Sequence, residues 1–147
     1  TDALPISIHV TGKGSVTRTA AFTLSVTKPS NGRTASSDTQ YPIDDYTWTV
    51  SPLQANVSGQ ANYQVTLSVD VDHTCMEDLG VWLVSPAGQT YVVKRQGTGQ
   101  YECTPWNGPK TFYVPGVSSQ ASGTWQLYFY DYGPGDTGTL NGWSVTL

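Results

Sequence analysis

The chain has 147 residues, which is the size of one domain and enough to bury a hydrophobic core. Its net charge is −4 and it has only 7 Lys and Arg residues, so neither nucleic acid nor an anionic membrane surface is expected as a partner. No apolar run approaches the roughly 18 residues of a membrane span, and the first residues lack the pattern of a signal peptide, which predicts a mature fragment cut from a longer precursor.

Residues 5–27 are predicted to form a β-hairpin or two adjacent strands. Ile6–Val10 and Ala21–Val26 alternate between apolar and polar residues, and a glycine-rich turn separates the two segments. We interpret residues 1–28 as N-terminal strands or as the end of a preceding immunoglobulin-like module. Residues 29–38 are rich in Pro, Asn, Gly and Ser, lack any periodicity and are predicted to be a linker. The main domain is then expected to span residues 39–147.

Short strands separated by turn residues are predicted throughout the main domain, a spacing that favours an all-β sandwich or barrel. In the strand that begins at Tyr63, every second residue is apolar, so one face is expected to lie against the core. Trp82, Trp125 and Trp143 fall within strands and are predicted to be core residues. The predicted strands are Tyr46–Val50, Tyr63–Val71, Val81–Ser85, Thr90–Lys94, Thr111–Val114, Thr124–Tyr130 and Gly138–Leu147.

Cys75 and Cys103 are the only two cysteines, and they could be free thiols or a disulfide. The absence of a CxxC motif and the presence of only two His residues argue against a structural zinc site, which favours the disulfide. A bond would hold the irregular stretch Gln96–Pro109 against the sandwich. It would also favour an oxidising, extracellular location, so the protein is predicted to be secreted.

Several short motifs follow one another in the main domain. Asp72-His73-Thr74 leads to Asp78-Leu79, a strand runs into Ser85-Pro86-Ala87-Gly88, and Gly123-Thr124-Trp125 precedes Asp136-Thr137-Gly138 and a closing Trp143-Ser144 strand. Taken together and in order, these motifs resemble the P-domain (P/Homo B domain) of subtilisin-like proprotein convertases and bacterial secreted proteases. The resemblance covers about Tyr41 to Leu147. It implies a jelly-roll β-sandwich on the C-terminal side of a secreted protease. Cys75 and Met76 depart from the family pattern.

Acidic residues on predicted turns suggest a calcium site, because Ca²⁺ is bound by carboxylate and carbonyl oxygens. The resemblance points the same way, since bacterial members of this family are often stabilised by calcium. The alternative is that these acids only cap turns and keep the surface soluble. No EF-hand pattern is present. The candidate ligands are Asp70, Asp72, Asp78, Asp131 and Asp136.

His73 with a neighbouring Asp and one of many serines could resemble a hydrolytic triad. No Gly-x-Ser-x-Gly segment is present, and the family places the His-Thr pair in a turn that ends a strand. We therefore predict that the chain has no catalytic residues and is not itself an enzyme.

Tyr128, Tyr130 and Tyr132 alternate with Leu127 and Phe129, so the three tyrosines are expected on the face opposite the core. Such a stripe is a candidate binding surface. It could instead be covered by a loop or by the catalytic domain of the same precursor.

The sequence thus predicts a non-catalytic accessory domain that serves a secreted serine or metalloprotease. It would stabilise the catalytic domain, assist its folding or hold an extended or fibrous protein substrate. The alternative is a carbohydrate-binding module of a secreted hydrolase, because a jelly roll with exposed aromatic residues is also typical of such modules.

Overall fold

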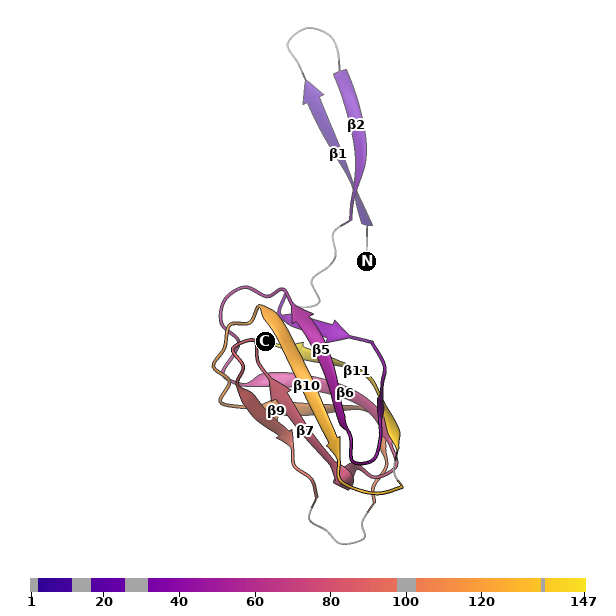
Figure 1. Ribbon diagram of the computed structural model, residues 1–147. Helices are drawn as coiled ribbons and strands as arrows, with labels where there is room; N and C mark the ends of the chain where they lie inside the picture. The colour runs from indigo at the N-terminus through magenta and orange to yellow at the C-terminus, as the bar shows by residue number, and fades with distance from the viewer. Residues whose placement is uncertain (1–2, 12–16, 26–31, 98–102, 136) are drawn as a thin grey trace. The chain divides into compact units, whose positions relative to one another are not determined.

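The computed structural model describes residues 3–11, 17–25, 32–97, 103–135 and 137–147. Almost all of its regular structure is β (Figure 1). A single short 3₁₀ helix, η1 (Met76–Asp78), lies among the described residues. None of the described helices has the length and apolar character needed to span a bilayer. The strands are β1 (Ala3–Thr11), β2 (Thr17–Ser25), β3 (Thr34–Ser37), β4 (Tyr41–Ile43), β5 (Trp48–Ala55), β6 (Val65–His73), β7 (Leu79–Val84), β8 (Thr90–Lys94), β9 (Trp106–Val114), β10 (Gly123–Asp131) and β11 (Gly138–Thr146).

The chain divides into two compact units, Thr1–Asn31 and Gly32–Leu147. In the first unit, β1 and β2 pair antiparallel, with Ala3 opposite Ser25 and Thr11 opposite Thr17. Two strands of this length and register form the predicted hairpin. Its interpretation as the end of an immunoglobulin-like module stays a prediction.

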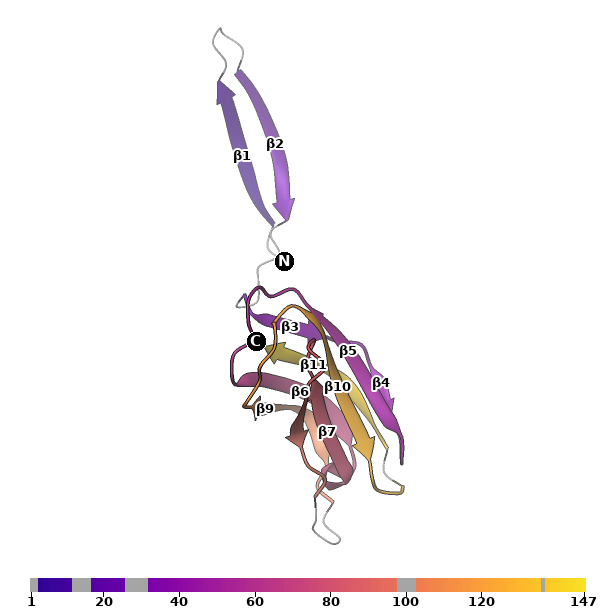
Figure 2. The same cartoon turned by 60° about the vertical axis from the view of Figure 1, so that its left-hand side comes forward.

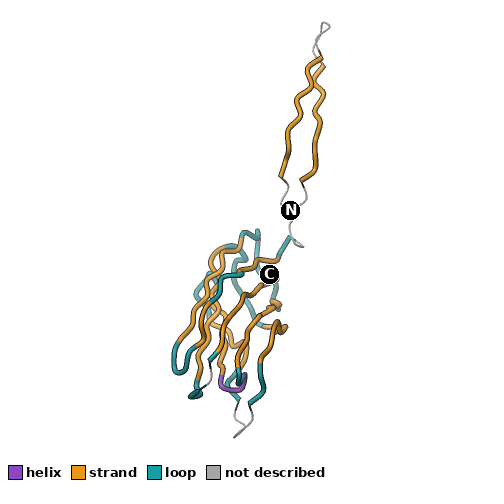
Figure 3. Tube along the Cα trace, turned by 90° about the vertical axis from the view of Figure 1, so that its right-hand side faces the viewer, coloured by secondary structure: helices purple, strands orange, loops and turns teal. Residues whose placement is uncertain are grey.

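The second unit is a sandwich of two antiparallel sheets. One sheet has the strand order β5-β10-β7-β8, and the other has the order β3-β11-β6-β9 with β4 also paired to β11. Figures 1 and 2 show the first sheet packed over the second, and Figure 3 shows the layers from the side with η1 at the end of the sandwich away from the C-terminus. The predicted all-β sandwich is confirmed, whereas the jelly-roll connectivity stays a prediction.

The core lies between the inner faces of the two sheets, as the alternating patterns predict. In β6, Val65, Leu67, Val69 and Val71 are completely buried, while the residues between them are partly or fully exposed. In β10 the buried residues include Trp125, Leu127 and Phe129. Apolar burial of this kind contributes about 25 cal/mol per Å² removed from water.

The main unit begins at Gly32 rather than near Thr39, so the prediction of a linker over residues 29–38 is wrong for its second half. Thr34–Ser37 form β3 and pair antiparallel with the end of β11. Only Ala35 packs against the core, as a partly buried residue. An edge strand held mainly by backbone hydrogen bonds needs no apolar alternation, which explains why the sequence pattern did not reveal it.

The stretch Gln96–Pro109 is also more regular than predicted, because β9 begins at Trp106. This Trp is completely buried, and its indole Nε1–H donates to the carbonyl oxygen of Gly108 at 2.9 Å. The Trp106 ring packs against Phe112 of the same strand at 5.6 Å between centroids.

Arg33 joins both ends of the main unit. Its guanidinium donates to the carbonyl oxygens of Leu147, the last residue, and of Gln60 (2.7 Å) in the loop between β5 and β6. The backbone N–H of Leu147 donates in return to the carbonyl oxygen of Arg33 at 2.8 Å. The start of β3, the end of β11 and that loop are therefore held at one point.

We predict that Arg33→Ala lowers the free energy of unfolding by about 1.5–3 kcal/mol, because the partly buried hydrogen bond to the carbonyl oxygen of Leu147 loses its charged donor. Urea denaturation of the chain measures this loss. Arg95→Ala is the matched control, because Arg95 is an exposed arginine and its loss is expected to cost less than about 0.5 kcal/mol. Equal losses in the two variants would contradict a stabilising role for the Arg33 hydrogen bonds.

Candidate functional site

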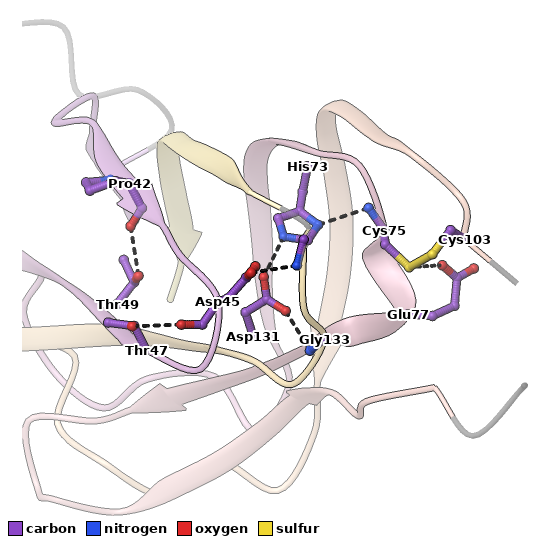
Figure 4. A network of polar contacts seen from close by, with 11 residues as sticks. Pro42, Asp45, Thr47, Thr49, His73, Cys75, Glu77, Cys103, Asp131 and Gly133 are labelled. Atoms are coloured by element: carbon purple, nitrogen blue, oxygen red, sulfur yellow. Dashed lines mark hydrogen bonds and ion pairs between the residues drawn. A yellow bond between two sulfur atoms is a disulfide. The ribbon is translucent and has the colours of Figure 1, made fainter. Parts of the chain in front are cut away.

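The most buried polar pair of the described residues joins the two sheets at one end of the sandwich (Figure 4). His73 ends β6 and Asp131 ends β10, and both side chains are fully buried. The distance from His73 Nε2 to Asp131 Oδ2 is 2.9 Å. His73 Nδ1 accepts a hydrogen bond from the backbone N–H of Cys75 at 3.1 Å, so we assign the proton to Nε2, which donates to Asp131.

Asp131 also holds two further segments. Its second carboxylate oxygen accepts from the backbone N–H of Gly133 at 3.0 Å. Its backbone carbonyl accepts from Tyr46, which precedes β5 and has a positive φ of 54°. Because both His73 nitrogens are engaged inside the protein, the ring has no atom available for proton transfer to a substrate. The His-Asp pair therefore acts as a structural tie between sheets and loops.

The predicted disulfide between Cys75 and Cys103 is confirmed. The disulfide lies beside η1, whose residues also form hydrogen bonds with Thr104, the residue after Cys103. Glu77 accepts from the backbone N–H of Thr104 at 2.7 Å, and hydrogen bonding to Thr104 holds the pKa of Glu77 below its ordinary value. The backbone N–H of Met76 donates to the carbonyl oxygen of Thr104.

Asp70 and Asp72, two of the five predicted metal ligands, lie on the outer side of β6, away from the core. They accept hydrogen bonds from the side-chain amide of Asn141 at 3.3 and 3.0 Å. A donor thus occupies the place where a cation would have to sit between these two carboxylates.

The other predicted ligands lie elsewhere. Asp131 is committed to His73 and Gly133, and Asp136 lies outside the described residues. Asp78 is in η1, close to Cys75 and Cys103. That trio is the one close group of potential metal ligands in the described part of the chain, and its sulfurs are bonded to each other. The predicted calcium ligands among the described residues therefore do not converge on a single metal site.

Calcium binding near Asp72 and Asp78 stays a prediction, which thermal melts in calcium and in EDTA test. A bound ion would raise the melting midpoint, since a ligand at a hundredfold excess over its Kd stabilises by about 2.7 kcal/mol. Asp78→Ala would then lower the midpoint in calcium more than in EDTA. If chelation leaves the midpoint unchanged, these acids are surface charges and turn residues.

A second candidate site covers the outer face of the sheet β5-β10-β7-β8. We call it the aromatic face and define it by five residues: Trp48, Trp82, Tyr128, Tyr130 and Tyr132. Ring contacts connect them all. The Trp48 ring lies 5.4 Å from that of Trp82, 6.1 Å from Tyr128 and 4.9 Å from Tyr130, and Tyr130 lies 4.6 Å from Tyr132.

The aromatic face differs from an ordinary solvent-exposed sheet face, which is polar or charged. Trp48 is 55% exposed and Tyr132 is 40% exposed. None of the outward-facing residues of β5, β10 and β7 carries a charge. Depletion of charge with enrichment of Trp and Tyr is typical of the centre of a binding interface.

The sequence predicted only part of this face. Tyr128, Tyr130 and Tyr132 lie where their alternation places them, although Trp48 partly covers the first two. Trp82 was predicted to be a core residue, and this is wrong. Leu79, Val81 and Leu83 fill the core from β7, whereas Trp82 lies outward over Gly80, where an added Cβ would come within 2.4 Å of its ring.

Two grooves flank Trp82 on the aromatic face. One has a volume of about 360 Å³ and is lined by Trp48, Trp82, Val84, Thr90 and Tyr128. The other has a volume of about 270 Å³ and is lined by Trp82, Val92, Arg95, Gln96 and Tyr132. Trp82 is the wall that the grooves share.

A family model described as the proprotein convertase P-domain matches residues 63–147. The transglutaminase-activating metalloprotease of Streptomyces mobaraensis is 28% identical over 97% of this chain and 18% of its own length. The extracellular basic protease of Dichelobacter nodosus is 32% identical over 76% of this chain and 18% of its own length.

The chain thus spans about a fifth of the length of these relatives. Among solved structures, the serine protease of Aeromonas sobria covers 99% of this chain with 27% of its own, at a TM-score of 0.56 and 16% identity. This likeness concerns the fold alone.

Proposed function

The chain belongs to the proprotein convertase P-domain family, and on this basis we propose that it is a non-catalytic accessory domain of a secreted protease. The observation that carries the proposal is the family match together with the two protease relatives, each of which is matched over a small share of its length. One of them is named as extracellular, which supports secretion. Its partner is then the catalytic domain of the same precursor.

The structure supports a role without chemistry. His73, the residue most suggestive of catalysis, has both ring nitrogens engaged and no exposed side-chain surface. A general base must reach the proton that it abstracts, and the buried imidazole of His73 cannot reach a substrate. We infer that the domain stabilises the attached catalytic domain and helps to hold protein substrates.

Two assays test the accessory role. The purified chain is expected to leave casein intact, and hydrolysis that disappears in His73→Ala would overturn the non-catalytic assignment. In the full-length protease, a variant that destabilises this domain, such as Asp131→Ala, is expected to shorten the thermal inactivation half-life of the peptidase. Asp44→Ala, which removes an exposed acid outside the polar network, is the control. Equal half-lives in the two variants would remove the stabilising role.

The aromatic face also supports a second candidate, a carbohydrate-binding module, because exposed aromatic rings stack on sugar rings. Retention of the chain on insoluble polysaccharide, lost in a Tyr130→Ala variant, would favour that function. Failure to bind polysaccharide leaves the protease role as the remaining one.

A further inference from the structure

The five tryptophans fall into two groups, according to whether the indole N–H donates a hydrogen bond to another residue. Trp106, Trp125 and Trp143 are buried and donate to protein acceptors, the carbonyl oxygens of Gly108 and Ala121 and the hydroxyl of Ser51, each at 2.9 Å. Trp48 and Trp82, by contrast, have no hydrogen-bond partner among the described residues. Their donors stay available at the surface.

Among the other polar groups, the tyrosine hydroxyls can donate and accept hydrogen bonds, whereas the Arg95 guanidinium can only donate. The hydroxyls of Tyr130 and Tyr132 also lack a partner among the described residues, and Arg95 adds a guanidinium to the second groove. No carboxylate lines either groove. The surface therefore offers apolar rings, donor-only indole and guanidinium groups and neutral hydroxyls, and neither groove has a charged acceptor.

A complementary ligand has apolar surface and many acceptors but few donors. A proline-rich segment meets this description because proline has no backbone N–H, while its ring is apolar. In the polyproline II conformation the carbonyl oxygens form no internal hydrogen bonds and remain open to donors. Aromatic-lined grooves with such donors are a recurrent way of binding these segments.

A neutral sugar fits less well. Each sugar hydroxyl donates as well as accepts, and grooves whose acceptors are a few neutral oxygens leave some of its donors unpaired, which costs binding energy. The side-chain oxygens that line the grooves belong to Thr90, Gln96, Tyr128 and Tyr132.

We propose that the two grooves beside Trp82 bind an extended, proline-rich protein segment in the polyproline II conformation. Pyrrolidine rings would occupy the grooves on either side of Trp82, and the indoles of Trp48 and Trp82 would donate to the ligand's carbonyl oxygens. This deepens the accessory role proposed above, since it names the protein segment that the domain holds. It can be tested on the 147-residue chain alone, so its failure is distinguishable from failure of the protease role.

Titration of the chain with a synthetic decaproline peptide, followed by tryptophan fluorescence and by calorimetry, tests the proposal. Saturable binding is expected, whereas a Gly-Ser peptide of the same length is expected to bind at least about tenfold more weakly. Trp82→Ala is expected to weaken decaproline binding by about tenfold or more, because it removes the wall of both grooves. Trp82→Phe keeps a smaller aromatic ring but loses the indole N–H donor, and it is expected to have an intermediate effect.

Tyr113→Ala is the matched control, since Tyr113 is a 64% exposed aromatic residue on β9 of the other sheet. The affinity of the Tyr113→Ala variant for decaproline is expected to stay within about twofold of that of the parent chain. Melting curves verify that each variant is folded. Absence of saturable binding to the parent chain, or equal affinity in the folded Trp82→Ala variant, would overturn the proposal. Binding of cellohexaose in preference to decaproline would also overturn it and would favour the carbohydrate module.

Discussion

Asp131→Ala is expected to be the most destabilising single substitution in the polar network, with a loss of about 3–5 kcal/mol in the free energy of unfolding. The carboxylate is fully buried and accepts from His73 and from Gly133. Its removal leaves two donors unpaired in the interior, and each costs about 1–3 kcal/mol of desolvation. Urea denaturation at neutral pH measures the change.

Two further variants identify the cause. Asp131→Asn keeps the volume but offers one acceptor where two donors converge, so it should lose less than Asp131→Ala but still more than about 1 kcal/mol. In a double-mutant cycle with His73→Ala, the two losses should be less than additive, because each single variant already breaks the shared bond. Asp44→Ala, which removes an exposed acid outside this network, should change stability by no more than about 0.5 kcal/mol. A similar small effect of Asp131→Ala would contradict the tie between sheets.

The core strands could be predicted from the sequence because their two faces differ in polarity. Val65, Leu67, Val69 and Val71 alternate with polar residues, and all four are buried as predicted. The same rule fails in β7, where Val81, Trp82, Leu83 and Val84 are all apolar. Such a run contains no signal for the face that points inward.

In β5 the pattern of apolar and polar residues predicts the wrong inward face. Trp48 is exposed, whereas its polar neighbours Thr49 and Ser51 are buried. Both hydroxyls have partners that no local pattern reveals: Thr49 donates to the carbonyl oxygen of Pro42, and Ser51 accepts from the indole of Trp143. A buried hydroxyl is tolerated when it is hydrogen-bonded. The sequence pattern therefore does not reveal Trp48, which contacts three other rings of the aromatic face.

Asp131 was grouped with the calcium candidates for a similar reason. From the sequence, an acid at the end of a strand looks like a loop ligand. Only the pairing of the sheets brings it to His73, which lies 58 positions away. The cysteines were easier to interpret, because a chain with two of them allows a single internal pairing.

Loss of the Cys75–Cys103 bond is expected to lower stability by roughly 3.5 kcal/mol, the loop-closure entropy of a cross-link between residues 28 positions apart. For a unit of this size, such a loss lowers the melting midpoint by about 10–15 °C. The Cys75→Ala/Cys103→Ala double variant and the parent chain in reductant should melt together, both below the oxidised parent. Adding reductant to the double variant should change nothing.

The cross-link is expected to act mainly on the unfolded chain, because other contacts keep the folded segment in place. The hydrogen bonds from Thr104 to Glu77 and from Met76 to Thr104 do not need the sulfurs, and Trp106 anchors the segment from within the core. The double variant should therefore keep the near-ultraviolet circular dichroism of the folded parent while its urea m-value rises, since a chain without the cross-link exposes more surface on unfolding. A loss of folded-state circular dichroism at low temperature would instead show that the disulfide is needed to assemble the end of the sandwich that carries His73 and Asp131.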